Sequence, residues 1–160
     1  MEDYSKDMKE EGIKLVSENR KAHFDYFLED RFEAGLVLVG TEIKAVREHS
    51  VNIKDAYVII KDDEAYVLNM NIAEYKQGNI FNHEPLRTRK LLLHKHEISR
   101  LKKKVKEEGY TLIPTKVYLE KGKAKLEFAI AKGKKNYDKR EDDKQKSIEK
   151  TIRKYSKEKY

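Results

Sequence analysis

The sequence predicts a mainly β protein: a small closed barrel of about six strands with inserted helices, followed by a flexible basic C-terminal tail. Three observations lead to this fold class. Short runs rich in β-branched and aromatic residues recur between turn residues. Two stretches, residues 41–47 and 94–108, show helical spacing of apolar residues instead. The core-forming pattern stops after Ala131, so the last segment cannot supply a second core.

The first part of the chain predicts extended structure. Residues 1–12 are polar, and we expect them to be frayed. Strand-like sequence begins at Lys14 and includes the aromatic run 24–28. A β-branched run over residues 35–39 follows, and Gly40 closes it.

A short helix and a hairpin come next. Thr41 can cap a helix over residues 42–47, in which Ile43 and Val46 supply an apolar side. Two β-rich runs, 56–60 and 65–68, flank a polar turn and predict a β-hairpin.

A long polar loop is expected over residues 71–85, and a helix over residues 94–108. The apolar residues of this helix recur at helical spacing, and Gly109 is placed to end it in a left-handed cap. They are Ile98, Leu101 and Val105.

Two final strands complete the predicted barrel. The run 110–119 leads to a turn at Lys121 and Gly122. The chain returns with apolar residues at every second position, which is typical of a strand with one buried face. These residues are Leu126, Phe128 and Ile130.

About six short strands with one helix between the early strands and another before the last pair suit a closed barrel of the OB type. The structural alternative is a ferredoxin-like sheet, whose strand–helix alternation is more regular than this one. We place the domain at residues 13–131. Residues 132–160 form the tail, which we expect to be disordered or a nascent helix in the free protein.

Positive charge is concentrated in two segments. Residues 86–106 hold nine Lys and Arg against one acidic residue, and residues 132–160 hold twelve against six. Residues 1–85 are acidic, although the whole chain carries a net charge of +7. Such segregation favours a polyanionic partner, because each cation near a phosphate releases counterions. A membrane surface fits less well, since neither segment has the bulky apolar face of an interfacial helix.

Composition also excludes several classes of protein. No run approaches the roughly 18 apolar residues of a membrane span, and the N-terminus lacks a signal pattern. The chain has no cysteine, so it has neither disulfides nor thiolate metal sites. We therefore expect a soluble cytoplasmic protein.

The first candidate nucleic-acid contact is the segment 86–94. Arg87 and Arg89 can bind phosphates through bidentate hydrogen bonds, and Lys90 adds a point charge. The alternative is a solvated basic helix end. That alternative leaves cations at a helix N-terminus unexplained, because they oppose the macrodipole.

The second candidate lies at the exit of the last strand, over residues 132–140. Gly133 allows the backbone to approach a phosphate, and Tyr137 can stack on an unpaired base. The alternative is a solubilising tail. The basic residues of this segment are Lys132, Lys134, Lys135, Lys139 and Arg140.

The third candidate combines residues 18–21 with Glu33. Asn19 and Arg20 can read base edges, with Lys21 beside them, and a carboxylate can accept from an amino group or a 2′-hydroxyl. On composition alone, Glu33 is an ordinary surface carboxylate.

Enzyme hypotheses find little support. His94 and His96 form a pair, but no third ligand follows at a suitable spacing for zinc. The chain has no phosphate-binding glycine loop and no nucleophile motif. We expect no catalytic activity and no cofactor.

Six strings in order resemble the SsrA-binding protein (small protein B) family. Together they cover about residues 13–141. The strings are Glu18-Asn19-Arg20-Lys21-Ala22-His23, Asp30-Arg31-Phe32-Glu33-Ala34-Gly35, Gly40-Thr41-Glu42-Ile43-Lys44, Arg87-Thr88-Arg89-Lys90-Leu91-Leu92-Leu93-His94, Gly109-Tyr110-Thr111-Leu112-Ile113-Pro114, and Ala131-Lys132-Gly133-Lys134-Lys135 with Tyr137-Asp138-Lys139-Arg140.

The resemblance implies that the barrel binds the tRNA-like domain of transfer-messenger RNA (tmRNA, or SsrA RNA) in trans-translation. It implies that the complex enters stalled ribosomes, where the tail occupies the decoding centre and the empty mRNA channel. Glu33, Leu92 and His94 match RNA-contact positions of the family, with Asn19, Arg20 and Lys21 as neighbours. No repeat or heptad suggests self-association, so we expect a monomer in the RNA complex. The residues that match the ribosome-binding tail are Lys132, Gly133, Lys134, Lys135, Tyr137, Asp138, Lys139 and Arg140. A general OB-type RNA-binding or ribosome-associated protein is the alternative.

Overall fold

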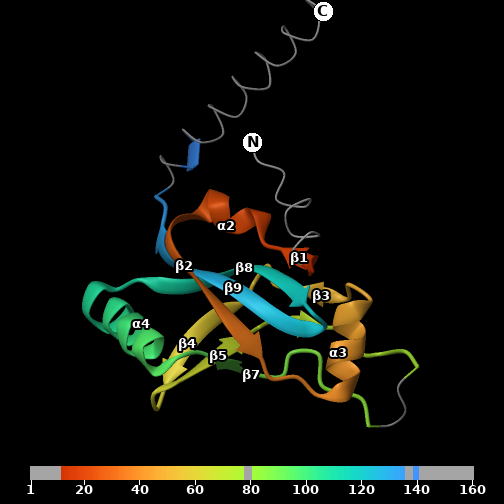
Figure 1. Cartoon of the computed structure of the whole chain (residues 1–160). Coiled ribbons are helices and arrows are strands. Elements are labelled where there is room, and N and C mark those ends of the chain that lie inside the picture. Colours follow the sequence, from red (N-terminus) through yellow and green to blue (C-terminus); the bar gives the residue numbers. More distant parts are fainter. Residues whose placement is uncertain (1–11, 78–80, 136–138, 141–160) are drawn as a thin grey trace, which may run out of the picture.

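The computed structural model describes residues 12–77, 81–135 and 139–140 (Figure 1). Its strands are β1 (Ile13–Glu18), β2 (Tyr26–Leu36), β3 (Val51–Asn52), β4 (Tyr57–Lys61), β5 (Glu64–Leu68), β6 (Asn71–Ile72), β7 (Arg89–Leu92), β8 (Thr111–Glu120) and β9 (Lys123–Gly133). Its helices are α2 (Arg20–Asp25), α3 (Gly40–Arg47) and α4 (Lys95–Glu108).

Six strands close on one another in a ring. They pair in the order β8-β4-β5-β7-β2-β9, and β9 returns to β8 in a long antiparallel hairpin. Strand β1 adds to the free edge of β8, while β3 and β6 form a separate pair. The predicted mainly β class, with about six strands in closed order and inserted helices, is confirmed.

Strands β2 and β9 form the longest contact of the ring. Their antiparallel pairing runs from Tyr26 opposite Gly133 to Gly35 opposite Lys125. On β9, Leu126, Phe128 and Ile130 are fully buried as predicted. Ala129 and Ala131 are buried too, so the alternation of buried and more exposed residues holds only from Lys123 to Phe128. The turn before β9 lies at Lys121 and Gly122, both with positive φ.

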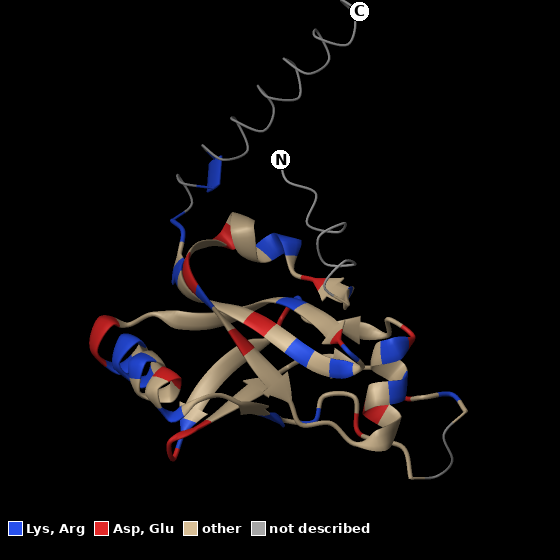
Figure 2. Ribbon diagram, viewed as in Figure 1, with Lys and Arg blue, Asp and Glu red and all other residues tan. Residues whose placement is uncertain are grey.

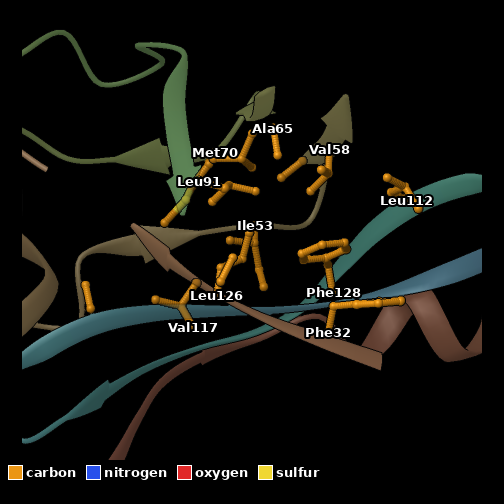
Figure 3. Packing of buried hydrophobic residues seen from close by; sticks show 14 of the residues in the cluster. Phe32, Ile53, Val58, Ala65, Met70, Leu91, Leu112, Val117, Leu126 and Phe128 are labelled. Atoms are coloured by element: carbon orange, nitrogen blue, oxygen red, sulfur yellow. The ribbon is translucent and has the colours of Figure 1, made fainter. Parts of the chain in front are cut away.

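The interior of the ring is one hydrophobic core (Figure 3). Phe32 of β2 and Phe128 of β9 stack with ring centroids 5.7 Å apart. Val46 brings α3 into this core, and Leu101 does the same for α4. Each such buried side chain contributes about 1.5–3 kcal/mol by its removal from water, so these residues fix the helices on the strands.

Helices α3 and α4 lie at opposite ends of the ring (Figure 1). Helix α4 begins after His94, whose backbone N–H donates to the side chain of Glu97. It ends at Gly109, which has a φ of 72°. The predicted helix over residues 94–108 and its left-handed glycine cap are therefore confirmed.

The prediction that Thr41 caps α3 is wrong. The helix begins at Gly40, and the Glu42 side chain accepts a hydrogen bond from the backbone N–H of Val39. The hydroxyl of Thr41 instead lies 2.9 Å from Nδ1 of the buried His83. A tertiary partner far along the chain has replaced the local capping interaction.

Two further segments differ from the prediction. Phe24 was expected in a strand, but it lies in α2, which the Asn19 side chain caps by accepting from the N–H of Ala22. Ala22 packs on the outside of β8 and β9, against Ile113 and Ala131. The expected loop 71–85 starts with β6, a strand too short to show an alternating pattern.

The predicted boundary between domain and tail is also displaced. Strand β9 continues to Gly133, two residues beyond Ala131, because β2 still pairs with it there. The predicted frayed residues 1–11 and the expected disorder or nascent helix over residues 136–138 and 141–160 lie outside the described residues.

Candidate nucleic-acid interface

Glu33 projects from β2 and is held by two neighbours on the ring. The hydroxyl of Tyr118 on β8 donates to Oε2 of Glu33, and Nζ of Lys125 on β9 lies 3.8 Å from its Oε1. Burial and this hydrogen bond raise the pKa of Tyr118, so its hydroxyl remains a donor. Because the Glu33 side chain is 49% exposed, its carboxylate can still accept from an RNA amino group or 2′-hydroxyl.

A hollow of about 420 Å³ is lined by Lys125, the ion-pair partner of Glu33, and by Gly35, two residues along β2 from Glu33. Leu92 of β7 lies opposite Gly35 of β2, and its side chain is 58% exposed. Lys123 and Lys125 border this apolar floor. The arrangement suits a nucleotide whose sugar or base covers the leucine while its phosphate approaches the lysines. The lining residues are Gly35, Leu36, Leu38, Ile43, Leu92, Lys123, Ala124 and Lys125.

His94 lies at the end of β7, two residues after Leu92. Its exposed imidazole stacks on that of His96, with centroids 5.5 Å apart and an interplanar angle of 9°. Lys90 is exposed on the same outward side of β7 as Leu92, because residues alternate along a strand. The structure thus gathers Glu33, Lys90, Leu92 and His94 on one surface, which we call the β2–β7 surface.

Arg89 requires a correction. Its side chain is 0% exposed, and it forms an ion pair with Glu42, which is equally buried. Its guanidinium also donates to the carbonyl oxygens of Met70, at 2.6 Å, and Pro85, at 3.0 Å. The ion pair and these hydrogen bonds of the guanidinium are all made inside the protein, so the predicted direct contact with a phosphate does not fit this side chain.

Arg87 shares the same carboxylate. Its Nη2 lies 2.6 Å from Oε1 of Glu42, and its side chain is 37% exposed. Burial alone raises the pKa of Glu42, but hydrogen bonds from Arg87, the Val39 N–H and Arg89 outweigh it and hold the pKa below its usual value. This cluster of Glu42, Arg87 and Arg89 fixes the segment that leads into β7.

Asn19 is likewise structural in this arrangement. It is 4% exposed, and its amide donates to the Pro114 carbonyl oxygen at 3.0 Å while its side-chain oxygen caps α2. The predicted base contact through this side chain is therefore not supported. Arg20 and Lys21 are exposed on α2, at the far end of β2 from Gly35, about 30 Å along the strand.

The first residues of the tail lie against α2. The Lys134 backbone N–H donates to the Asp25 carbonyl oxygen at 2.9 Å, and its ammonium donates to that of His23 at 3.1 Å. Lys139 forms an ion pair with Asp25 at 3.2 Å. We call Arg20, Lys21, Lys132, Gly133, Lys134, Lys135, Lys139 and Arg140 the α2–tail surface; Tyr137 and Asp138 lie outside the described residues.

Sequence reasoning missed several residues of these surfaces. Lys123 and Lys125 alternate with the buried Ala124 and Leu126 on β9, which is a signal for an outward basic row. Phe27 is 49% exposed, and the Lys134 ammonium lies 5.0 Å from its ring centroid. No local pattern distinguishes Phe27 from its half-buried aromatic neighbours Phe24 and Tyr26.

Other site types receive no support where the structure can be described. Among residues 12–77, 81–135 and 139–140, no three potential His, Asp or Glu ligands converge on a metal position. Within those ranges, no helix is both long and apolar enough to cross a membrane.

Comparisons with known proteins point in one direction. The family model of the SmpB protein matches residues 16–158. The SsrA-binding protein of Thermoanaerobacter pseudethanolicus is 51% identical over 152 residues, which are 95% of this chain and 97% of that one. The corresponding protein of Caldanaerobacter subterraneus subsp. tengcongensis is 53% identical over 149 residues, covering 93% and 94%.

A solved structure has the same architecture. It is described as "tmRNA-SmpB: a journey to the center of the bacterial ribosome" and superposes with a TM-score of 0.64 at 44% identity. The match covers 82% of this chain and 93% of that one.

Proposed function

Because the chain belongs to the SmpB protein family, we propose that it binds the tRNA-like domain of transfer-messenger RNA and delivers this RNA to stalled ribosomes for trans-translation. Relatives about half identical over nearly their full length are SsrA-binding proteins. The protein acts by binding rather than by catalysis, and its place of work is the cytoplasm, where ribosomes translate.

The β2–β7 surface is the proposed binding site for the tRNA-like domain. The observation that carries this assignment is the exposed Leu92 in a hollow that Lys123 and Lys125 also line. Lys125 in turn lies 3.8 Å from the carboxylate of Glu33, which the Tyr118 hydroxyl holds in place. A contiguous exposed apolar patch with a polar rim marks an interaction site, and here Leu36, Leu38 and Ile43 line the hollow together with Leu92. Cations next to a fixed acceptor suit an RNA fold in which phosphates and a 2′-hydroxyl or amino group lie close together.

The α2–tail surface is the proposed ribosome-facing side. Lys134 and Lys139 hold the start of the tail on α2 through His23 and Asp25. These contacts lie about 30 Å along β2 from Gly35, so the two surfaces can engage different RNAs at once. In this proposal the tail enters the decoding centre and the empty mRNA channel, with Tyr137 and Asp138 among its contacts.

The test compares the affinity of the full chain for the tRNA-like domain with its affinity for an unrelated RNA of equal length, across a salt series. A preference for the tRNA-like domain that persists at high salt is expected, because base and shape contacts do not depend on counterion release. Equal affinities that fall together with salt would replace this proposal with a general RNA-binding protein.

A further inference from the structure

Helix α4 carries an outward row of four lysines: Lys95, Lys102, Lys103 and Lys106. Ser99 occupies the same side of the helix between Lys95 and Lys102. At 100° and 1.5 Å per residue, they lie within an arc of about 100° and extend over about 16 Å. Figure 2 shows the basic colouring along this helix, at the end of the ring opposite α3.

Most of this α4 lysine row has no acidic partner. Lys95, Lys103 and Lys106 are exposed and form no ion pair with any residue in the described part of the chain. Lys102 pairs with Asp63 of the β4–β5 turn at 3.0 Å. The other ion-paired cations of the helix, Arg100 with Asp30 and Lys104 with Glu108, lie outside the row.

The fold itself does not require these charges. Leu101 is the buried residue that attaches α4 to the core, and it lies on a different side of the helix from the row. Lys95 occupies the first turn, where the macrodipole opposes a cation. The row therefore adds electrostatic repulsion among its lysines, which an anionic partner would relieve.

The position of the row indicates which anion it meets. Strand β7 passes into α4 through Leu93 and His94, so the row starts directly beside the β2–β7 surface. Its members carry no aromatic ring on which an unpaired base could stack. A shallow hollow of about 360 Å³ along the row is bordered by Ser99, Lys102, Lys103, Lys106, Asp63 and Glu107.

We propose that the α4 lysine row binds the sugar–phosphate backbone of a double-stranded RNA segment. This inference rests on the proposed function, because it extends the RNA contact from the β2–β7 surface along α4. The duplex is either a stem of the transfer-messenger RNA bound at that surface or a helix of ribosomal RNA, and both present the same phosphate chemistry.

The experiment titrates the full chain with a blunt RNA duplex that lacks any tRNA-like fold, across a salt series. A Lys103→Gln/Lys106→Gln variant is compared with Lys14→Gln/Lys76→Gln, a matched removal of two exposed lysines outside the row. We expect the first variant to lower the slope of log K against log salt by about two and to weaken binding by about tenfold or more. The control should change neither quantity.

Asp63→Asn supplies an effect of opposite sign. It removes a carboxylate from the row and releases Lys102, so duplex affinity should rise. Unchanged duplex affinity and salt slope in the Lys103/Lys106 variant would overturn the inference. That result is also the one expected if the row bound an acidic protein instead of RNA. A Leu92→Ala chain should retain duplex affinity, because Leu92 belongs to the other surface.

Two further measurements separate the sources and the proposals. If the duplex is part of transfer-messenger RNA, the Lys103/Lys106 substitutions should weaken binding to the full-length RNA more than binding to the tRNA-like domain alone. If the duplex is part of ribosomal RNA, the substitutions should weaken only co-sedimentation with ribosomes. If the wild-type chain shows no preference for the tRNA-like domain, the proposed function is contradicted, independently of the result for the α4 lysine row.

Discussion

Tyr118 donates its hydroxyl hydrogen to Glu33 across two strand boundaries of the ring, from β8 over β9 to β2. Tyr118 is 6% exposed, whereas the Glu33 carboxylate is half exposed. A buried donor thus orients an exposed acceptor, and the Lys125 ammonium at 3.8 Å balances its charge. In the proposed binding site, Glu33 contacts the RNA and Tyr118 positions the Glu33 carboxylate.

Tyr118→Phe should therefore weaken binding to the tRNA-like domain less than Glu33→Ala does. The ring of Tyr118 stays packed, so the free energy of unfolding should fall by only about 1–2 kcal/mol for the lost hydrogen bond to a charged group. A double-mutant cycle measured by RNA titration checks this. Equal effects of Tyr118→Phe in the presence and absence of Glu33 would contradict a positioning role.

Arg89→Met should destabilise the fold by about 3 kcal/mol, the lower end for breaking a buried ion pair, because Glu42 loses its buried partner but keeps Arg87. Urea unfolding measures this loss. Arg87→Ala should cost less, since Arg87 is partly exposed. The folded fraction of Arg89→Met should bind RNA with nearly wild-type affinity. A stable variant that cannot bind RNA would instead support the direct contact between Arg89 and a phosphate that the sequence predicted.

The Glu42 cluster also predicts a dependence of stability on pH. The folded state holds the pKa of Glu42 below its ordinary value of 4.5, so the unfolded chain takes up the proton first as pH falls. The stabilisation is complete above pH 4.5 and is lost as pH falls through the folded-state pKa. The free energies of unfolding of the wild-type chain and of Glu42→Gln should therefore approach each other as the pH is lowered. A difference that stays constant with pH would show that protonation of Glu42 is not coupled to folding.

Leu92→Ala should lower affinity for the tRNA-like domain by about tenfold, because a contacting apolar side chain typically contributes 1–2 kcal/mol to an interface. Stability should change little, since Leu92 is 58% exposed. Leu15→Ala, on the 38% exposed leucine of β1, is the matched control and should leave affinity unchanged. Similar losses in both variants would indicate a nonspecific effect.

A chain that ends at Lys135 keeps β9 and the contacts of Lys134 with α2. We expect it to bind the tRNA-like domain within about twofold of the full chain, because the β2–β7 surface is intact. Peptide tagging on stalled ribosomes should be lost, as measured in a reconstituted translation reaction. Full tagging by this shortened chain would refute the proposed role of the tail.

Local patterns were sufficient to predict most of the elements. The alternation of Leu126, Phe128 and Ile130 predicted β9, and helical spacing with Gly109 predicted the extent of α4. They were insufficient for α2, β3, β6 and β7, which are six, two, two and four residues long. Elements this short contain too few periods to show a pattern, and their stability comes from tertiary packing.

The sequence by itself determined most of the longer strands and helices, the two basic segments and the family resemblance, because these depend on residue type and spacing alone. Only the tertiary structure decided what individual polar residues do. Arg87 and Arg89 are two residues apart in one motif, yet Arg89 is buried because Glu42, 47 positions away, meets it inside the fold. The cost of burying a charge depends on partners that only folding brings together, so no local pattern could separate the structural arginine from an RNA contact.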